Sequence, residues 1–119
     1  MRALPKIILE QQPHGLRITT AHANSWWARA IGLLSTPRPP ADGVGLLLDP
    51  GRGIHTIGMR YAIDVAFLDR HLRILRVASA VSPNRIRCAP KGTRFCLETR
   101  SGGLPSTLEG DFFTHRQGE

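Results

Sequence analysis

Residues 53–69 read GIHTIGMRYAIDVAFLD, and this stretch decides how the rest of the sequence is interpreted. Apolar residues occupy its odd positions from 57 to 67, whereas most even positions are small or polar. A period of two predicts a β-strand whose odd face lies against a core. The other face would carry Thr56, Arg60 and Asp64. Residues four apart on an unbroken strand are roughly 13 Å apart, so Arg60 and Asp64 meet only if the strand bends at Gly58.

Short apolar runs bounded by glycine, proline or asparagine predict further strands on both sides of this stretch. The predicted strands are 7–9, 16–20, 44–48, 72–78, 85–88, 94–99 and a last apolar strand from 112. The first two should form a hairpin. The segment 72–78 should return antiparallel to 62–68 and form a second, central hairpin.

One segment, residues 24–34, has the periodicity of a helix. An Asn-Ser pair at its start can accept the first free amide hydrogens, and Trp27, Ile31 and Leu34 form an apolar stripe. A proline-rich loop follows and ends the helix. We therefore expect an α+β, mainly β fold, in which an antiparallel sheet curls into a small barrel or sandwich and one short helix in the N-terminal half covers it.

Length and charge limit the possible classes of protein. A chain of 119 residues is expected to form a single domain over 1–119, with a core from about 7 to 114. Its 16 Lys and Arg outnumber 9 Asp and Glu, which gives a net charge of +7 and favours polyanions. Apolar runs are too short for a signal peptide or a membrane span, so we expect a soluble, cytoplasmic protein, monomeric or dimeric.

Two cysteines, Cys88 and Cys96, flank a Pro-Lys-Gly turn. Without an export signal, reduced thiols are expected, and a redox switch is the alternative. The turn also predicts that the flanking segments pair as a hairpin. Two cysteines are too few for a structural zinc site unless a histidine converges on them, and the spacing gives no hint of that. No metal or cofactor is expected.

Four segments stand out together: ARAIGLL at 28–34, GVGLLL at 43–48, IHTIGMR at 54–60 and IDVAFL at 63–68. Through these segments the sequence resembles the DUF192 family of uncharacterised proteins over roughly residues 16–113. Many members carry Phe-Trp-Met-Lys-Asn-Thr where this sequence has residues 55–60. The resemblance implies a compact, β-rich fold and brings no established activity.

The candidate ligand-binding residues are His55, Thr56, Arg60, Asp64 and Trp26. An arginine can bind a carboxylate or phosphate through two hydrogen bonds, and histidine titrates near neutral pH. Trp26 points about 100° away from Trp27 on a helix and can line a cleft. The structural alternative is that Asp64 pairs with Arg60 or caps backbone amides, because an isolated buried charge is costly.

The favoured hypothesis is a binding module that holds a small polar or anionic ligand around the strand from His55 to Asp64. An alternative is a basic protein that binds nucleic acid weakly. A lesser alternative is a hydrolase-like enzyme with His55 and Asp64 as acid–base partners. The sequence lacks the nucleophile elbow, zinc-protease and phosphate-loop motifs, so we lean against an enzyme and assign no catalytic residue.

Overall fold

The computed structural model describes residues 6–12, 15–23 and 37–118. The strands are β1 (Lys6–Gln12), β2 (Arg17–Ala23), β3 (Val44–Leu48), β4 (Gly53–His55), β5 (Ile63–Leu68), β6 (Ile74–Val81), β7 (Ile86–Cys88), β8 (Phe95–Arg100) and β9 (Phe112–Gln117). A 3-10 turn, η2 (Ser106–Leu108), precedes β9. The described residues contain no α-helix, and the helix expected over 24–34 lies outside them. The described part of the chain contains no helix that is long and apolar enough to cross a membrane.

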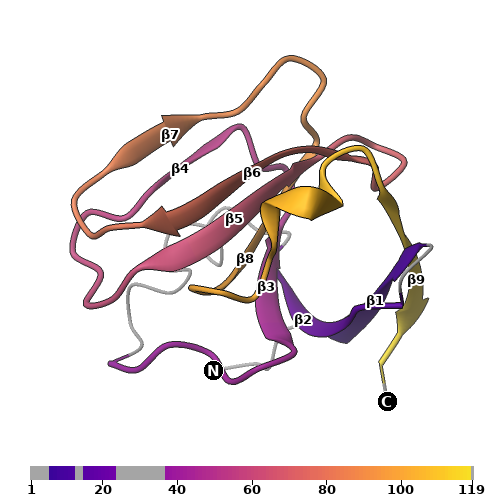
Figure 1. Cartoon of the computed structure of the whole chain (residues 1–119), viewed down its shortest axis with the longest axis horizontal. Helices are drawn as coiled ribbons and strands as arrows, with labels where there is room; N and C mark the ends of the chain where they lie inside the picture. Colours follow the sequence, from indigo (N-terminus) through magenta and orange to yellow (C-terminus); the bar gives the residue numbers. More distant parts are fainter. Residues whose placement is uncertain (1–5, 13–14, 24–36, 119) are drawn as a thin grey trace.

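Seven strands form one sheet in the order β6-β5-β8-β3-β2-β1-β9. The β1–β2 and β5–β6 hairpins are confirmed, and β2 pairs with β3 in parallel, as an exception in an otherwise antiparallel sheet. The sheet curls strongly, so that β9 approaches β6 at the top of the barrel in Figure 1. There the backbones of Arg73 and Phe112 form an isolated antiparallel β-bridge, and the Phe113 N–H donates to the Leu72 carbonyl at 3.0 Å. The expected mainly β, curled sheet is confirmed.

The interior of the curled sheet holds the larger apolar cluster, which we call the barrel core. Its buried members are Leu9, Ile18, Leu47, Ala66, Leu68, Leu72, Ile74, Val77, Leu97, Leu104, Leu108 and Phe113. Every strand of the large sheet contributes to it, because alternate residues of each strand point to the same face. Leu72, Leu104 and Leu108 come from the segments between strands. Burial of this shared apolar surface is what holds the curled sheet closed.

A second, two-stranded sheet of β4 and β7 packs against the outer face of the large sheet through Ile54. Between the two sheets lies an outer core of Ala23, Leu46, Leu48, Ile54, Met59, Ile63, Val65, Phe67, Val81 and Cys96. Strand β5 contributes to both cores and is buried at all six positions. Its even-numbered face is therefore no polar surface, contrary to our expectation.

The stretch 53–69 is not one strand. It divides into β4 and β5, which belong to different sheets, and the turn between them contains Gly58 with a φ of +85°. The bend expected at Gly58 is present, yet it separates the two halves instead of folding one strand. Ile57, which the alternation placed on the buried face, is 53% exposed in this turn.

The hairpin predicted between Cys88 and Cys96 is wrong. Cys88 lies in β7 opposite Gly53, whereas Cys96 lies in β8 between Leu48 and Phe67. The Pro90–Thr93 turn is present, with the Thr93 N–H donating to the Pro90 carbonyl at 3.2 Å. It carries the chain from the small sheet to the large one. Cys88 is exposed and Cys96 buried, both as free thiols.

Candidate ligand pocket at one end of the barrel

Asp64 is a structural residue in the barrel wall, at 2% exposure. Its Oδ1 accepts the Ala80 N–H at 2.8 Å, and its Oδ2 accepts those of Gly102 and Leu104 at 2.9 and 3.0 Å. Three amide hydrogen bonds compensate for the loss of water around a buried carboxylate. Asp64 thus joins β5 to β6 and to the turn after β8. This agrees with the alternative stated above, in which Asp64 caps backbone amides.

The Thr56 side chain is equally occupied. Its hydroxyl donates to the Ser82 carbonyl at 2.6 Å and accepts the Arg85 N–H at 2.9 Å, which fixes the end of β4 against the segment before β7. His55 and Arg60 are exposed, and Trp26 lies outside the described residues. The structure therefore brings Thr56 and Asp64 into separate backbone networks. It gives no support to a His55–Asp64 acid–base pair.

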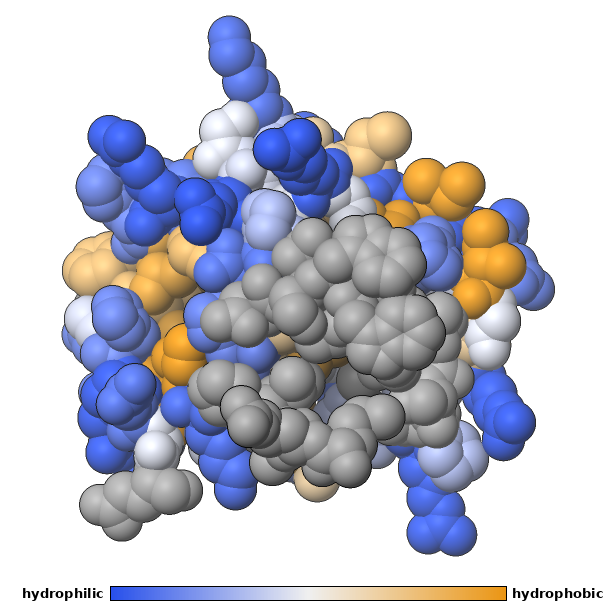
Figure 2. Space-filling model, turned by 180° about the vertical axis from the view of Figure 1, so that it is seen from behind, coloured by the Kyte–Doolittle hydropathy of each residue, from blue (hydrophilic) through white to orange (hydrophobic). Residues whose placement is uncertain are grey.

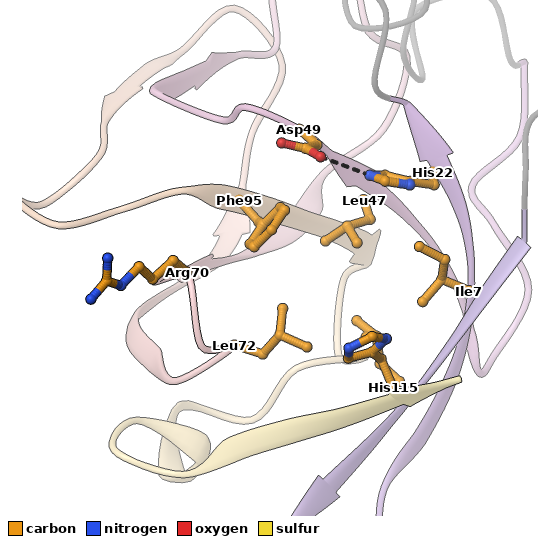
Figure 3. A pocket seen from close by; sticks show the side chains of 9 residues that line it. Ile7, His22, Leu47, Asp49, Arg70, Leu72, Phe95 and His115 are labelled. Carbon is orange, nitrogen blue, oxygen red and sulfur yellow. Dashed lines mark hydrogen bonds and ion pairs between the residues drawn. The ribbon is translucent and has the colours of Figure 1, made fainter. Parts of the chain in front are cut away.

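A cavity of about 190 Å³ lies instead at one end of the barrel core. Its wall is apolar and its rim carries ionisable side chains, as Figure 3 shows. The lining residues are Ile7, Leu9, His22, Leu47, Asp49, Arg70, Leu72, Phe95 and His115. Strands β1, β2, β3, β8 and β9 and the β5–β6 turn each contribute, so the closure of the barrel creates the cavity.

An ion-pair network fixes one side of the rim. The Asp49 carboxylate accepts hydrogen bonds from His22 Nε2 and from Arg94 Nε, each at 3.0 Å. The Arg94 guanidinium also lies 5.5 Å from the centre of the Phe95 ring. With Asp49 held by these partners, the exposed guanidinium of Arg70 and the imidazole of His115 lie on the remaining rim. This end of the barrel thus favours an anionic group over a cationic one.

Sequence reasoning missed His22, Asp49, Arg70 and His115. They are spread over almost the whole chain, and only strand order brings them together. Two weak signals existed: His22 interrupts a strand of small residues, and Asp49 directly follows the apolar strand 44–48. Within the described ranges, no group of three or more His, Cys, Asp or Glu side chains is arranged to hold a metal ion.

The opposite face of β8 carries two buried ionisable groups, Cys96 and Glu98. Burial raises the pKa of Glu98 from 4.5 to about 7. Burial, and then the negative charge of Glu98, raise the pKa of Cys96 from 9.0 to about 12, although a hydrogen bond from the Gly53 backbone opposes the shift. A thiol with so high a pKa forms little thiolate, so Cys96 is poorly suited to the redox switch considered above.

A family model, DUF192, described as an uncharacterized ACR, matches residues 7–108. A protein from Sinorhizobium meliloti, described as a "putative transcription regulator", has a similar structure with a TM-score of 0.82 and 17% identity, over 97% of this chain and 96% of that one. A protein of unknown function from Novosphingobium aromaticivorans also has a similar structure, with a TM-score of 0.75 and 19% identity, over 92% of this chain and 83% of that one. At these identities the likeness shows the fold alone. No curated protein matches the sequence.

Proposed function

We propose that this chain, which belongs to the DUF192 family of uncharacterised proteins, is a small-molecule binding module whose site is the cavity at the end of the barrel. The observation that carries the proposal is an apolar cavity of about 190 Å³ with Arg70 and His115 on its rim. The site thus differs in place from the one expected around residues 55–64, while the class of ligand stays the same.

The size of the cavity limits the ligand. Pockets for drug-sized molecules are about 300–1,000 Å³, so this one suits a smaller compound. Leu47, Leu72 and Phe95 offer an apolar wall, which favours a short aliphatic chain or a single ring. Binding would bury that apolar body, which is the main source of affinity in such sites.

The polar end of the ligand would lie at the rim. A guanidinium can donate two parallel hydrogen bonds to a carboxylate, and His115 adds a further donor. Asp49 is already held by His22 and Arg94. We therefore expect small monocarboxylic acids to bind, and the corresponding primary amines to bind poorly.

The test is a thermal-shift series with short aliphatic and aromatic monocarboxylates and their amine counterparts. A ligand of the folded state raises Tm by mass action. Ile7→Phe should fill the cavity and abolish the shift, whereas Ile8→Phe, on the neighbouring and half-buried position of β1, should retain it. Arg70→Gln should weaken carboxylate binding, with Arg76→Gln as an exposed control. An unchanged shift in Ile7→Phe, or no shift with any carboxylate, contradicts the proposal.

A second candidate function is nucleic-acid binding. The net charge of +7 favours it, and the Sinorhizobium meliloti protein of similar structure bears a regulator description. Affinity for duplex DNA should then fall steeply as salt is raised, since counterion release drives such binding. Anisotropy measurements at two salt concentrations test this, and an absence of DNA binding at low salt removes the candidate.

A further inference from the structure

The small sheet of β4 and β7 presents an exposed surface that the proposed pocket does not use. All three residues of β7 are exposed, and Ile86 at its start is 66% exposed. His55 lies directly opposite Ile86, so the two side chains share one face of the small sheet. Ile57 adds a second exposed aliphatic group in the turn after β4. In Figure 2, the side that carries β4 and β7 shows hydrophobic patches between hydrophilic side chains.

The outer edge of β7 also presents backbone groups that do not bond to β4. The Thr56 N–H donates to the Arg85 carbonyl at 2.9 Å. Hydrogen-bonded pairs recur every second residue in an antiparallel ladder, so Arg87 is the next residue of β7 that bonds to β4. The N–H and carbonyl groups of Ile86 and Cys88 therefore face away from β4. Among these groups, the Ile86 carbonyl accepts a hydrogen bond from the Arg87 guanidinium at 3.0 Å.

Charge on this surface has one sign. Segments 50–62 and 82–92 contain no Asp or Glu, and their basic residues are Arg52, Arg60, Arg85, Arg87 and Lys91. Like charges on both partners would oppose the pairing of β7 with β7 of a second copy. An acidic segment, in contrast, would be attracted during encounter and held in register. The surface is complementary to an extended, acidic chain with apolar side chains.

We infer that the edge of β7 binds an extended acidic peptide segment of a partner protein as an additional strand. In this mode, main-chain hydrogen bonds give affinity, and alternate side chains give specificity. Apolar side chains of the peptide would pack on Ile86 and Ile57, and its carboxylates would lie near Arg85 and Arg87. A peptide fits better than single-stranded nucleic acid, because the exposed large apolar groups here are aliphatic and lack the flat rings on which bases stack.

The probe is a labelled peptide of about ten residues that alternates valine with glutamate, long enough to cover the edge of β7. A peptide in which lysine replaces glutamate is the charge control. Two further peptides carry N-methyl groups on one or the other set of alternate residues. Strand addition predicts that one methylated peptide loses binding while the other keeps it, because only one set of N–H groups faces β7. Equal binding of both methylated peptides would overturn the inference.

Variants test the location. The double change Arg85→Glu, Arg87→Glu should weaken binding by at least about tenfold, equivalent to the loss of a charged contact. The matched change Arg76→Glu, Arg116→Glu alters the same net charge at exposed positions outside the small sheet, and should leave binding within about twofold. Equal losses in both pairs would show that net charge alone attracts the peptide, and would overturn the proposed site.

Amide exchange gives a readout that needs no variant. Bound peptide should slow exchange of the Ile86 and Cys88 N–H groups, while the Arg87 N–H, already bonded to β4, should change little. Unchanged exchange at Ile86 and Cys88 under saturating peptide contradicts strand addition. A single-stranded oligonucleotide serves as competitor, and a surface that binds it but not the valine–glutamate peptide also overturns the inference.

Discussion

Two buried carboxylates, Asp64 and Glu98, show how the environment of one residue decides its role. Asp64 receives hydrogen bonds from the three backbone amides of Ala80, Gly102 and Leu104. Glu98, at 5% exposure, lies in the apolar space between the sheets, and the loss of water raises its pKa. The sequence marks Asp64 as unusual, because a charge interrupts an apolar run. The sequence cannot say which groups satisfy this charge, since the three partners follow it by 16, 38 and 40 residues.

Asp64→Asn should destabilise the protein by about 2–4 kcal/mol, because the amide side chain brings an NH₂ group toward backbone donors and leaves buried N–H groups without an acceptor. Asp69→Asn is the matched control. The Asp69 Oδ1 atom accepts hydrogen bonds from the His71 and Arg73 N–H groups in a more exposed turn. Asp69→Asn should therefore lower the free energy of unfolding by less, about 1 kcal/mol. Urea unfolding of both variants measures the difference, and equal losses would contradict the structural role of Asp64.

Glu98→Gln should change how stability depends on pH. The pKa of Glu98 is about 7 in the folded state against 4.5 ordinarily, so the folded state holds the proton more tightly than the unfolded one. The free energy of unfolding therefore falls as pH rises from 4.5 to 7, by about 3 kcal/mol in total. Glutamine stays neutral, so the variant should be more stable than the native protein at pH 8 and gain little at pH 4.5.

Thermal unfolding at several pH values between 4.5 and 8 measures this effect. Glu10→Gln, an exposed change in a pair with Arg17, should leave the slope unaltered. A Glu98→Gln variant that keeps the native slope would show that another group causes the pH dependence.

At the level of strands, the sequence predicts those elements whose two ends are marked by turn residues. The runs 44–48 and 94–99 agree with β3 and β8 to within one residue, and both hairpins form as expected. The stretch 53–69 looks like one strand in the sequence but forms two, because period-two alternation continues through the turn after His55. The buried Thr56 hydroxyl, bonded to segments near residues 82 and 85, ends β4, and no local pattern announces such a distant partner.

For the molecule as a whole, the order of the strands in the sheet could not be predicted from the sequence. Apolar alternation predicts that a curled sheet forms, but not that β2 lies parallel to β3 or that β9 pairs with β1. The pocket depends on this order, because its residues come from both ends of the chain. The residues of the predicted site are separated for the same reason: His55 and Asp64, which we expected on one surface, lie in two different sheets.

Barrel closure gives a test at this scale. Phe113, fully buried in the barrel core, lies where β9 meets the start of β6. Phe113→Ala should destabilise the protein by about 3–5 kcal/mol through lost burial and a cavity. Phe112→Ala, next to it and 39% exposed, should cost much less. Chemical denaturation compares the two variants, and similar losses would mean that closure at this seam contributes little.

Strand β5 contributes side chains to both cores. Ile63, Val65 and Phe67 belong to the outer core, and Ala66 and Leu68 belong to the barrel core. If β5 detached, each core would lose a wall at the same moment. We therefore expect the two layers to unfold together in one cooperative transition. A substitution that destabilises the small sheet should therefore also destabilise the pocket, although the two lie on opposite faces of the large sheet.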